Sequence, residues 1–282
     1  MATFTLIADD YAMTAGVSRG ILRLLEHGRL SGTGAMTNRP HWKGWSHALR
    51  SFQGKADLGV HLNLTLGKPL TIMPAFAPTG VLPGIGEITK TALSLKLPLD
   101  EIMQEIEAQL EAFEQAMDRR PDFIDGHQHV QGLPGVRRAL LNLIQERYAG
   151  GTRPWLRDSS DSLARIVTRG RNMQKALAVA GLTSGFGNAA RKAGFLTNDS
   201  FAGFSAFDAK SDYATDFTSY LKATGSRHLV MCHPGELDDE IARIDPVVAT
   251  RPQELAFLMS EAASDAMRLA GLDLARLRPL AS

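Results

Sequence analysis

The sequence predicts an α/β fold with a mostly parallel sheet, in a chain of the length that a single α/β barrel needs. Short apolar runs alternate with longer amphipathic segments along the 282 residues. Strands that alternate with helices in this way favour a parallel sheet covered by helices. Because such a barrel takes about 250 residues, one domain over residues 1–282 accounts for the whole length.

Short apolar runs are the predicted strands. The first is apolar throughout, which is typical of a strand buried on both faces. The third alternates apolar residues with a polar face that carries His61 and Asn63. Another short strand is expected directly before Arg157. Apart from this short strand, the predicted strands span 3–8, 32–37, 57–64, 122–127 and 227–232.

Amphipathic segments are the predicted helices. Thr14 is placed to cap a first helix that ends at Gly28. The segment 100–119 repeats apolar residues at steps of three and four, with Asp100 as the expected N-cap. The segment 252–270 is the predicted closing helix. These helices fall between the predicted strands, as a parallel sheet requires.

The stretch 67–99 interrupts this alternation. It is rich in Pro and Gly and shows neither a helical nor a strand period. Irregular segments of this length in compact domains are usually functional. Two interpretations stay open, an insertion that closes over a substrate as a lid and a segment that packs against a second subunit.

Composition limits the classes of function. A net charge of +1 disfavours nucleic acid and anionic membranes as partners. The longest apolar runs fall short of the roughly 20 residues that cross a bilayer, and the N-terminus lacks the pattern of a signal peptide. The single cysteine, Cys232, excludes an internal disulfide framework. We therefore expect a cytoplasmic protein without membrane insertion and, from the base rate for oligomers, a homodimer.

Aspartate and histidine side chains gather at the ends of four predicted strands. Active sites of parallel α/β folds lie at the carboxyl ends of their strands. Four separate strand ends that supply the same residue types predict one shared site. These residues are Asp9, Asp10, His61, Asp125, His127, His129 and His233.

A carboxylate with two imidazoles is the ligand set of a catalytic metal site, because three protein ligands leave positions open for water and substrate. The set suits Zn²⁺, Mn²⁺, Fe²⁺ or Co²⁺, and Mg²⁺ stays open. Such a metal lowers the pKa of its bound water and polarises a carbonyl group. Of the adjacent Asp9 and Asp10, one would bind the cation. The other would serve as base, its charge tolerated because the cation is close.

The stretch DGHQH at 125–129 places two histidines two residues apart. In an extended chain, His127 and His129 point to the same side. Two alternatives stay open, a pair of ligands for one metal, or one ligand and one substrate contact.

Five stretches together resemble the YdjC/ChbG family of carbohydrate deacetylases. The resemblance implies a distorted TIM-like (β/α) barrel and the hydrolytic removal of acetyl from an N-acetylated amino sugar, such as a chitooligosaccharide. It also implies one divalent metal ion, with Mg²⁺ or Zn²⁺ favoured. The matching stretches are ADD at 8–10, LGVHLNLT at 58–65, DGHQHV at 125–130, MCHPGE at 231–236 and RPQELAFL at 251–258.

The resemblance also implies roles for residues of this chain. By position, Asp10, His61 and His127 are similar to the family's metal ligands. Asp9 is similar to its general base, and His233 to the acid that protonates the departing amine. The expected substrate contacts are His129, Asn63, Arg157, Asp199 and Thr37, and Arg157 has pairing with Asp158 as its alternative.

Other functions remain as alternatives. One is deacetylation of a lipid-linked N-acetylglucosamine such as a hopanoid glycoside, since the family has members linked to hopanoid sugars. A metal-dependent phosphoesterase is disfavoured, because the chain has no P-loop and no basic cluster near the matching stretches. A sugar-binding relative without catalysis is disfavoured because Asp9 and His233 are both present.

Overall fold

The computed structural model describes residues 2–278 and contains one eight-stranded sheet in which every pairing is parallel. Its strands are β1 (Ala2–Tyr11), β2 (Gly32–Ala35), β3 (Asp57–Leu62), β4 (Phe123–Gly126), β5 (Trp155–Leu156), β6 (Ser200–Ala202), β7 (His228–Cys232) and β8 (Leu272–Leu274). The order is β5-β4-β3-β2-β1-β7-β6, and β8 pairs with β1.

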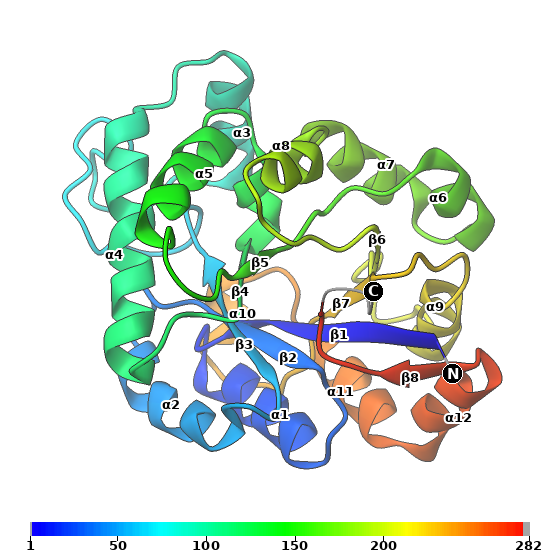
Figure 1. Cartoon of the computed structure of the whole chain (residues 1–282). Coiled ribbons are helices and arrows are strands. Elements are labelled where there is room, and N and C mark those ends of the chain that lie inside the picture. Colours follow the sequence, from blue (N-terminus) through cyan, green and yellow to red (C-terminus); the bar gives the residue numbers. More distant parts are fainter. Residues whose placement is uncertain (1, 279–282) are drawn as a thin grey trace.

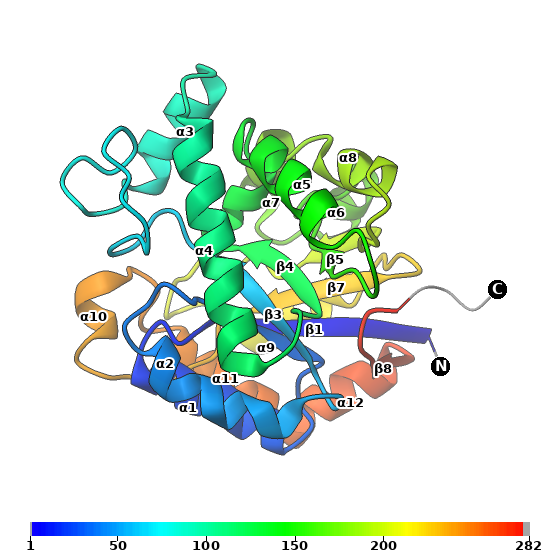
Figure 2. The same ribbon diagram turned by 60° about the vertical axis from the view of Figure 1, so that its left-hand side comes forward.

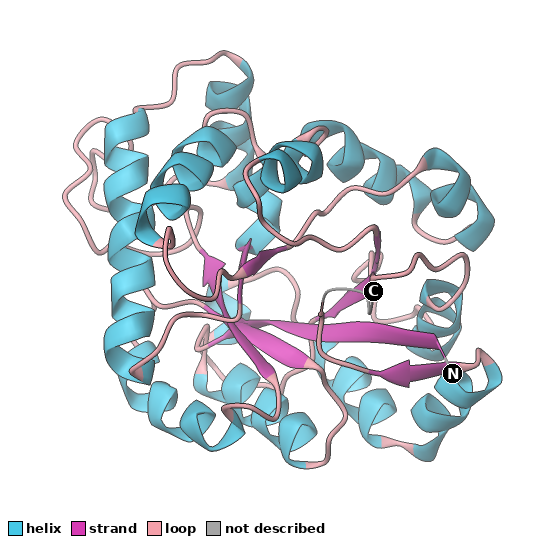
Figure 3. Cartoon of the chain, viewed as in Figure 1, coloured by secondary structure: helices cyan, strands magenta, loops and turns pink. Residues whose placement is uncertain are grey.

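Helices surround this sheet on its outer side (Figures 1 and 3). The α-helices are α1 (Ala15–Glu26), α2 (Trp42–Leu49), α3 (Ile85–Leu93), α4 (Leu99–Met117), α5 (Val136–Arg147), α6 (Leu163–Arg169), α7 (Met173–Leu182), α8 (Phe186–Lys192), α9 (Tyr213–Tyr220), α10 (Ile241–Ile244), α11 (Arg251–Met259) and α12 (Glu261–Leu269). Two 3₁₀ helices are η1 (Arg50–Phe52) and η2 (His127–Gly132).

The sheet curls into an incompletely closed barrel. Its two edge strands, β5 and β6, are only two and three residues long. A single parallel bridge between Leu156 and Thr197 joins the two edges, in place of a continuous ladder. The expected distorted TIM-like barrel of mostly parallel strands is therefore confirmed.

The long strand β1 lies in the middle of the sheet and brings the other strand ends into register. Ala8 faces Thr33 of β2 on one side and Cys232 of β7 on the other. On the next pair of strands, His61 of β3 faces Asp125 of β4. Because all these strands are parallel, the residues that end them lie along one edge of the sheet. Asp9 and Asp10, at the end of β1, lie in the middle of that edge.

The expected strands and the first two helices are confirmed, with small shifts at their ends. The hydroxyl of Thr14 accepts a hydrogen bond from Val17 N and caps α1 as expected. The expected cap at Asp100 is wrong. The helix α4 begins one residue earlier, after Pro98, and Asp100 lies in its first turn without a capping bond. There its negative charge still favours the helix N-terminus.

The closing helix predicted over 252–270 is wrong as a single element. It is two helices, α11 and α12, and Ser260 separates them in an extended conformation with φ −81° and ψ 163°. The apolar periodicity continues through Ser260, so it does not reveal the break. The break lets the two helices pack against different elements: α12 packs against the strand β8, and α11 packs against the helix α1.

The stretch 67–99 is more ordered than its sequence predicts. It contains α3 (Figure 2). Side chains of α4 hold in place the loop that precedes α3. Glu105 of α4 accepts hydrogen bonds from the amides of Leu70 and Thr71, and Glu101 accepts from the amide of Phe76. These carboxylates replace the ladder or helix bonds that the loop lacks. Packing of this stretch against a second subunit stays a prediction.

Candidate active site

Three donor atoms from three strand ends converge on one point, as the sequence predicts. The atoms that Asp10, His61 and His127 offer as ligands lie within 4.8 Å of one another. Asp10 Oδ1 is 2.9 Å from His127 Nδ1 and 3.4 Å from His61 Nε2. All three side chains are buried. The structure thus brings the three residues together, and their role as metal ligands stays a prediction.

The backbone at the end of β1 turns sharply to present the aspartates. Asp10 has a φ of 71° and Ala12 a φ of 68°, in the left-handed region that non-glycine residues seldom adopt. The turn is closed by a hydrogen bond from Met13 N to Asp10 O, 2.9 Å long. Backbone strain of this kind gathers at functional sites. Here it places the Asp10 carboxylate beside the two imidazoles.

A second carboxylate fixes the orientation of His61. Asp125 Oδ1 lies 2.6 Å from His61 Nδ1, so His61 Nε2 is left to face the Asp10 side. A carboxylate on the far nitrogen of a metal-binding histidine sets its tautomer and ring orientation. Burial alone would lower the pKa of His61, but Asp125 and Asp9 outweigh it and raise the pKa to about 10. The cluster therefore attracts positive charge.

Arg157 joins the two carboxylates that flank the cluster. Its Nη1 and Nη2 donate to both oxygens of Asp9 at 2.7 and 2.5 Å, and Nη2 also lies 2.5 Å from Asp125 Oδ2. This bidentate pair holds the Asp9 carboxylate in one orientation. Burial raises the pKa of Asp9, and the charges of Arg157 and His61 offset the rise only in part.

Arg251 plays the corresponding part for Asp10. Its Nη2 donates to Asp10 Oδ2 at 2.7 Å and lies 3.3 Å from Asp245 Oδ2. Burial by itself would raise the pKa of Asp10, but the charges of His127 and Arg251 hold the pKa well below its usual 3.8. Asp10 therefore stays ionised, the state in which a carboxylate binds a cation.

The donor set fits a divalent metal. One carboxylate oxygen and two imidazole nitrogens, with a pocket on the open side, make the three-ligand arrangement of a catalytic ion. Asp9, His61 and Asp125 form a second group of adjacent donor atoms. That group is less suitable, because the Arg157 guanidinium already pairs with both of its carboxylates. We therefore assign the candidate metal position to Asp10, His61 and His127.

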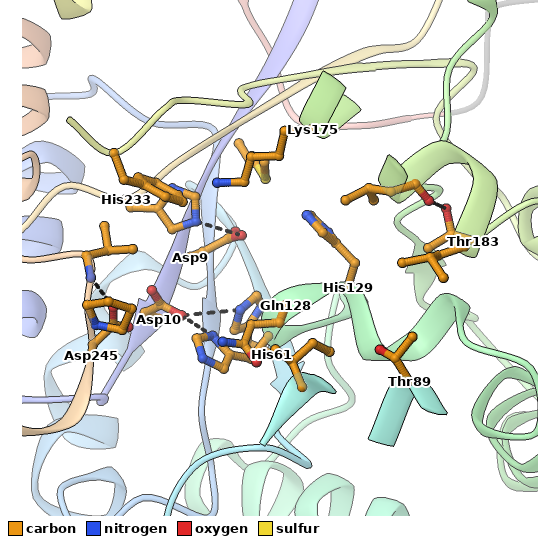
Figure 4. A pocket seen from close by; sticks show the side chains of 18 of the residues that line it. Asp9, Asp10, His61, Thr89, Gln128, His129, Lys175, Thr183, His233 and Asp245 are labelled. Carbon is orange, nitrogen blue, oxygen red and sulfur yellow. Dashed lines mark hydrogen bonds and ion pairs between the residues drawn. The ribbon is translucent and has the colours of Figure 1, made fainter. Parts of the chain in front are cut away.

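A pocket of about 310 Å³ opens over this cluster (Figure 4). Its floor carries the charged and imidazole groups, and its walls are largely apolar. The walls come from α3, α7 and the loops after β6 and β7. The lining residues on these walls are Ile85, Thr89, Leu133, Lys175, Val179, Leu182, Thr183, Phe207, Met231, Pro246 and Val247.

His233 follows β7 and lines the pocket on the side of Asp9. Its Nε2 lies 3.9 Å from Asp9 Oδ2. Its backbone N–H donates to Glu254 of α11 at 2.6 Å, and burial raises the pKa of Glu254 to about 7. Burial lowers the pKa of His233 well below 6.5, and the nearby cations Arg251 and Lys175 lower it further. His233 is thus neutral near pH 7 in this environment.

His129 lines the pocket but does not join the three donor atoms. The expectation that His127 and His129 point to the same side is wrong, because the chain is not extended there. Gln128 and His129 have φ values of 54° and 62° inside η2. The left-handed turn sends His127 to Asp10, and it packs His129 edge-on against Phe201 and Phe204. The structure thus leaves His129 in position for a substrate contact.

Two of the expected substrate contacts are structural. Asn63 is fully buried and outside the pocket lining. Its amide donates to Leu66 O at 2.7 Å, while its oxygen accepts from the Leu66 amide, so it fastens the loop after β3. Thr37 donates to Gln109 O at 2.8 Å and ties the end of β2 to α4. Both lie at strand ends, but their polar atoms are used within the fold.

The other two expected contacts are also corrected. Arg157 is fully buried and lies below the pocket floor, paired with Asp9 and Asp125 and not with Asp158. Asp199 precedes β6, at the opposite end of the sheet from the cluster. There it accepts a hydrogen bond from the Arg227 amide at 2.9 Å. The sequence shows that Asp199 adjoins a short apolar run. It does not show at which end of the resulting strand this residue lies.

Sequence reasoning missed Arg251, Lys175 and Glu254. Arg251 and Glu254 lie three residues apart in α11, so one helical turn reaches both Asp10 and His233. Arg251 and Glu254 both lie in the stretch RPQELAFL that matches the family, but charged residues at the start of an otherwise amphipathic helix usually form a solvated face. Lys175 lies on α7, in a segment without any distinguishing motif.

The fold and this cluster define a class, a parallel α/β barrel protein with an Asp-His-His group that could hold a metal ion at the carboxyl ends of its strands. A model of the family described as "YdjC-like protein" matches residues 3–268, so the chain belongs to the YdjC-like family. No helix within residues 2–278 is long and apolar enough to span a membrane.

Relatives of known name are similar over part of the chain. A chitooligosaccharide deacetylase of Citrobacter koseri is 34% identical over 141 residues, which is 50% of this chain and 54% of the relative. A chitooligosaccharide deacetylase of Enterobacter sp. (strain 638) is 35% identical over 130 residues, 46% of this chain and 50% of the relative. The chain thus spans about half the length of the curated relatives it matches.

The fold as a whole resembles a solved structure. A protein from Enterococcus faecalis V583 aligns with a TM-score of 0.71 over 98% of this chain and 97% of its own, at 22% sequence identity. At this identity the likeness concerns the fold alone.

Proposed function

We propose that the protein is a metal-dependent hydrolase that removes acetyl from an N-acetylated amino sugar, with a chitooligosaccharide or a related glycan as substrate. The observation that carries the proposal is the convergence of donor atoms from Asp10, His61 and His127 within 4.8 Å at the floor of a pocket. The names of the partial relatives support the choice of substrate.

Asp10, His61 and His127 would hold one divalent ion. Two imidazole nitrogens favour Zn²⁺, Mn²⁺, Co²⁺ or Fe²⁺ over Mg²⁺, which prefers oxygen ligands. When bound, such an ion lowers the pKa of its water and polarises a carbonyl group.

Asp9 is the proposed general base. It lies next to the ligand Asp10, and Arg157 fixes both of its oxygens so that one face is directed to the pocket. Burial raises the pKa of Asp9, which makes the carboxylate a better proton acceptor than a solvated one. The fixed geometry removes the need to reorient the base during the reaction.

His233 is the proposed acid for the departing amine. A neutral imidazole needs a proton before it can donate one, and Asp9 Oδ2 lies 3.9 Å from Nε2. In the proposed reaction, a proton that Asp9 accepts from the attacking water passes through one bridging water to His233 Nε2, which then donates it to the departing amine. The Glu254 carboxyl fixes the backbone of His233 and so the direction of its ring.

The proposal is tested by metal content and acetate release together. Protein stripped with a chelator is reloaded with Zn²⁺, Mn²⁺, Co²⁺ or Mg²⁺ and assayed with N,N′-diacetylchitobiose and longer chitooligosaccharides. His127→Ala should lose both bound metal and acetate release. The matched control is His47→Ala, because His47 is an exposed histidine of α2 outside the pocket. Metal binding without acetate release from any acetylated sugar would refute the proposed substrate.

A further inference from the structure

One face of α7 forms a wall of the pocket. Lys175, Val179 and Leu182 follow each other at steps of four and three residues and all line it. This spacing places them on one side of a helix. Ile85 and Thr89 of α3, four residues apart, also line the pocket. A ligand above the Asp-His-His cluster therefore meets side chains of α3, within the stretch 67–99 that the sequence offered as a lid, and of α7, which the sequence did not connect with function.

Lys175 is the one lysine on the pocket wall, and it has no carboxylate partner within ion-pair distance in the described chain, residues 2–278. Its Nζ donates to Ser205 O at 3.1 Å and lies 3.5 Å from the centroid of the Phe207 ring. An ammonium group has three N–H donors. The carbonyl oxygen of Ser205 uses one, and Figure 4 shows the amine directed into the pocket, toward His233 and Asp9.

The carboxylates of the pocket already have arginine partners. Asp9 pairs with Arg157, and Asp10 and Asp245 pair with Arg251. Lys175 is therefore not needed to balance them. Ser205 O accepts from only one of the three N–H groups of this half-buried ammonium, so the other two are available to oxygen atoms of a ligand in the pocket.

We propose that Lys175 is a specificity-determining residue that donates hydrogen bonds to oxygen atoms of the acetylated sugar, while apolar faces of the sugar lie against Val179 and Leu182. This inference rests on the proposed function, since it takes the deacetylase substrate as the ligand. It assigns substrate recognition to α7, and chemistry to the residues at the strand ends.

Binding and turnover measure this role separately. Binding of N,N′-diacetylchitobiose is measured by calorimetry on the metal-loaded full chain carrying Asp9→Asn, with and without Lys175→Met. A lost hydrogen bond from a charged donor should weaken binding about 10- to 100-fold. In the chain with intact Asp9, Lys175→Met should raise KM by a similar factor and change kcat much less. Lys175→Arg, which keeps a cationic donor, should restore part of the affinity.

The pH dependence separates recognition from a structural role. Burial lowers the pKa of Lys175 to about 8, so the donor charge is lost as the pH rises through that value. Affinity should fall there in the wild-type sequence and not with Lys175→Met. The other titratable groups that face it are His129, His233, Glu254 and Asp9, and burial raises the pKa of Asp9 above 3.8. The pKa values of both histidines lie well below 6.5, and that of Glu254 is about 7.

The control is Lys192→Met on the exposed end of α8, which should leave binding unchanged. Equal affinity and equal KM with and without Lys175 would overturn the inference, and so would a failure of the metal-loaded chain to bind the acetylated sugar at all. Binding that depends on Lys175, without acetate release by any metal-loaded form, would instead refute the proposed reaction and leave the recognition role standing.

Discussion

The two ends of the barrel both bury a carboxylate among arginines, and they differ in what else surrounds it. At the N-terminal end, Asp57 of β3 is fully buried. Arg276 and Arg278 pair with its Oδ1 at 2.6 and 3.1 Å, and Oδ2 accepts from Trp155 Nε1 and Leu277 N. At the carboxyl end, Asp10 has one arginine and shares its other oxygen with two imidazoles at the floor of a pocket.

This difference shows how the same elements serve stability and function. A carboxylate accepts about four hydrogen bonds, and four donors of the fold fill Asp57, so it ties β3 to the segment after β8. Around Asp10, a cation can replace the proton that the carboxylate shares with the imidazoles. The pocket lets that cation reach the three side chains. The N-terminal end should therefore respond to mutation in stability, and the carboxyl end in metal binding and rate.

The largest expected effect is at the carboxyl end. Asp9→Asn keeps the shape of the side chain and one oxygen that accepts from Arg157. It removes the carboxylate that is the proposed base. We expect kcat to fall about 100- to 10,000-fold, with metal content and thermal unfolding close to the wild-type values. Steady-state kinetics with metal analysis on the same preparation checks this. An unchanged kcat would remove Asp9 from the role of base.

The next largest effect is at the N-terminal end. Asp57→Ala leaves Trp155 Nε1 and the Leu277 amide without their acceptor and removes the carboxylate that pairs with Arg276 and Arg278. Its free energy of unfolding should fall by about 3–5 kcal/mol, measured by urea denaturation. Asp273→Ala, at an exposed position of β8, is the control and should change it by less than about 0.5 kcal/mol. A loss of activity per folded molecule in Asp57→Ala would contradict the division between the two ends.

A pH effect on stability should also arise at the N-terminal end. His228 begins β7, buried between Ser200 Oγ at 2.7 Å and Tyr220 O at 2.8 Å. Burial, aided by the charge of Arg169, lowers its pKa to about 4 from the usual 6.5. Below pH 6.5 the unfolded chain binds a proton that the folded chain does not, so stability is complete above that pH and falls as the pH drops.

From neutral pH to about pH 4, this group should cost about 3 kcal/mol of unfolding free energy. His228→Gln, which cannot take up the proton, should lose less stability over the same range by about that amount. Urea denaturation of both proteins at several pH values measures the difference. Parallel pH profiles would show that His228 does not contribute.

The smallest expected effect concerns the partner of a ligand. Asp125→Asn removes the charge that orients His61, and metal affinity should fall about 10- to 100-fold. Metal titration with a competing chelator measures it. Asp118→Asn, at the exposed end of α4, should leave the affinity unchanged. Equal affinity for both variants would mean that the His61 ring is held by packing alone.

The proximity of the proposed metal ligands was predictable because these residues lie at strand ends, where a parallel sheet gathers its functional groups. Asp10, His61 and His127 each follow or end an apolar run, and the topology places those runs side by side. His129 was not predictable in the same way, because its direction depends on two left-handed residues that the sequence does not mark. Arg157 follows a short strand, as the sequence predicts. Its partners could not be predicted, because Asp125 and Asp9 lie 32 and 148 positions away along the chain.

The sequence by itself determined the class of fold and the identity of the Asp-His-His group that is proposed to bind a metal. Apolar periodicity and the residues that end each strand are local properties, and they persist wherever the strands are placed. Only the tertiary structure decided that Arg157 and Arg251 hold the carboxylates, that α3 and α7 enclose the pocket and that Asn63 and Thr37 are used within the fold. Those assignments depend on distances between segments far apart in the chain, and such distances are set by packing of the whole core.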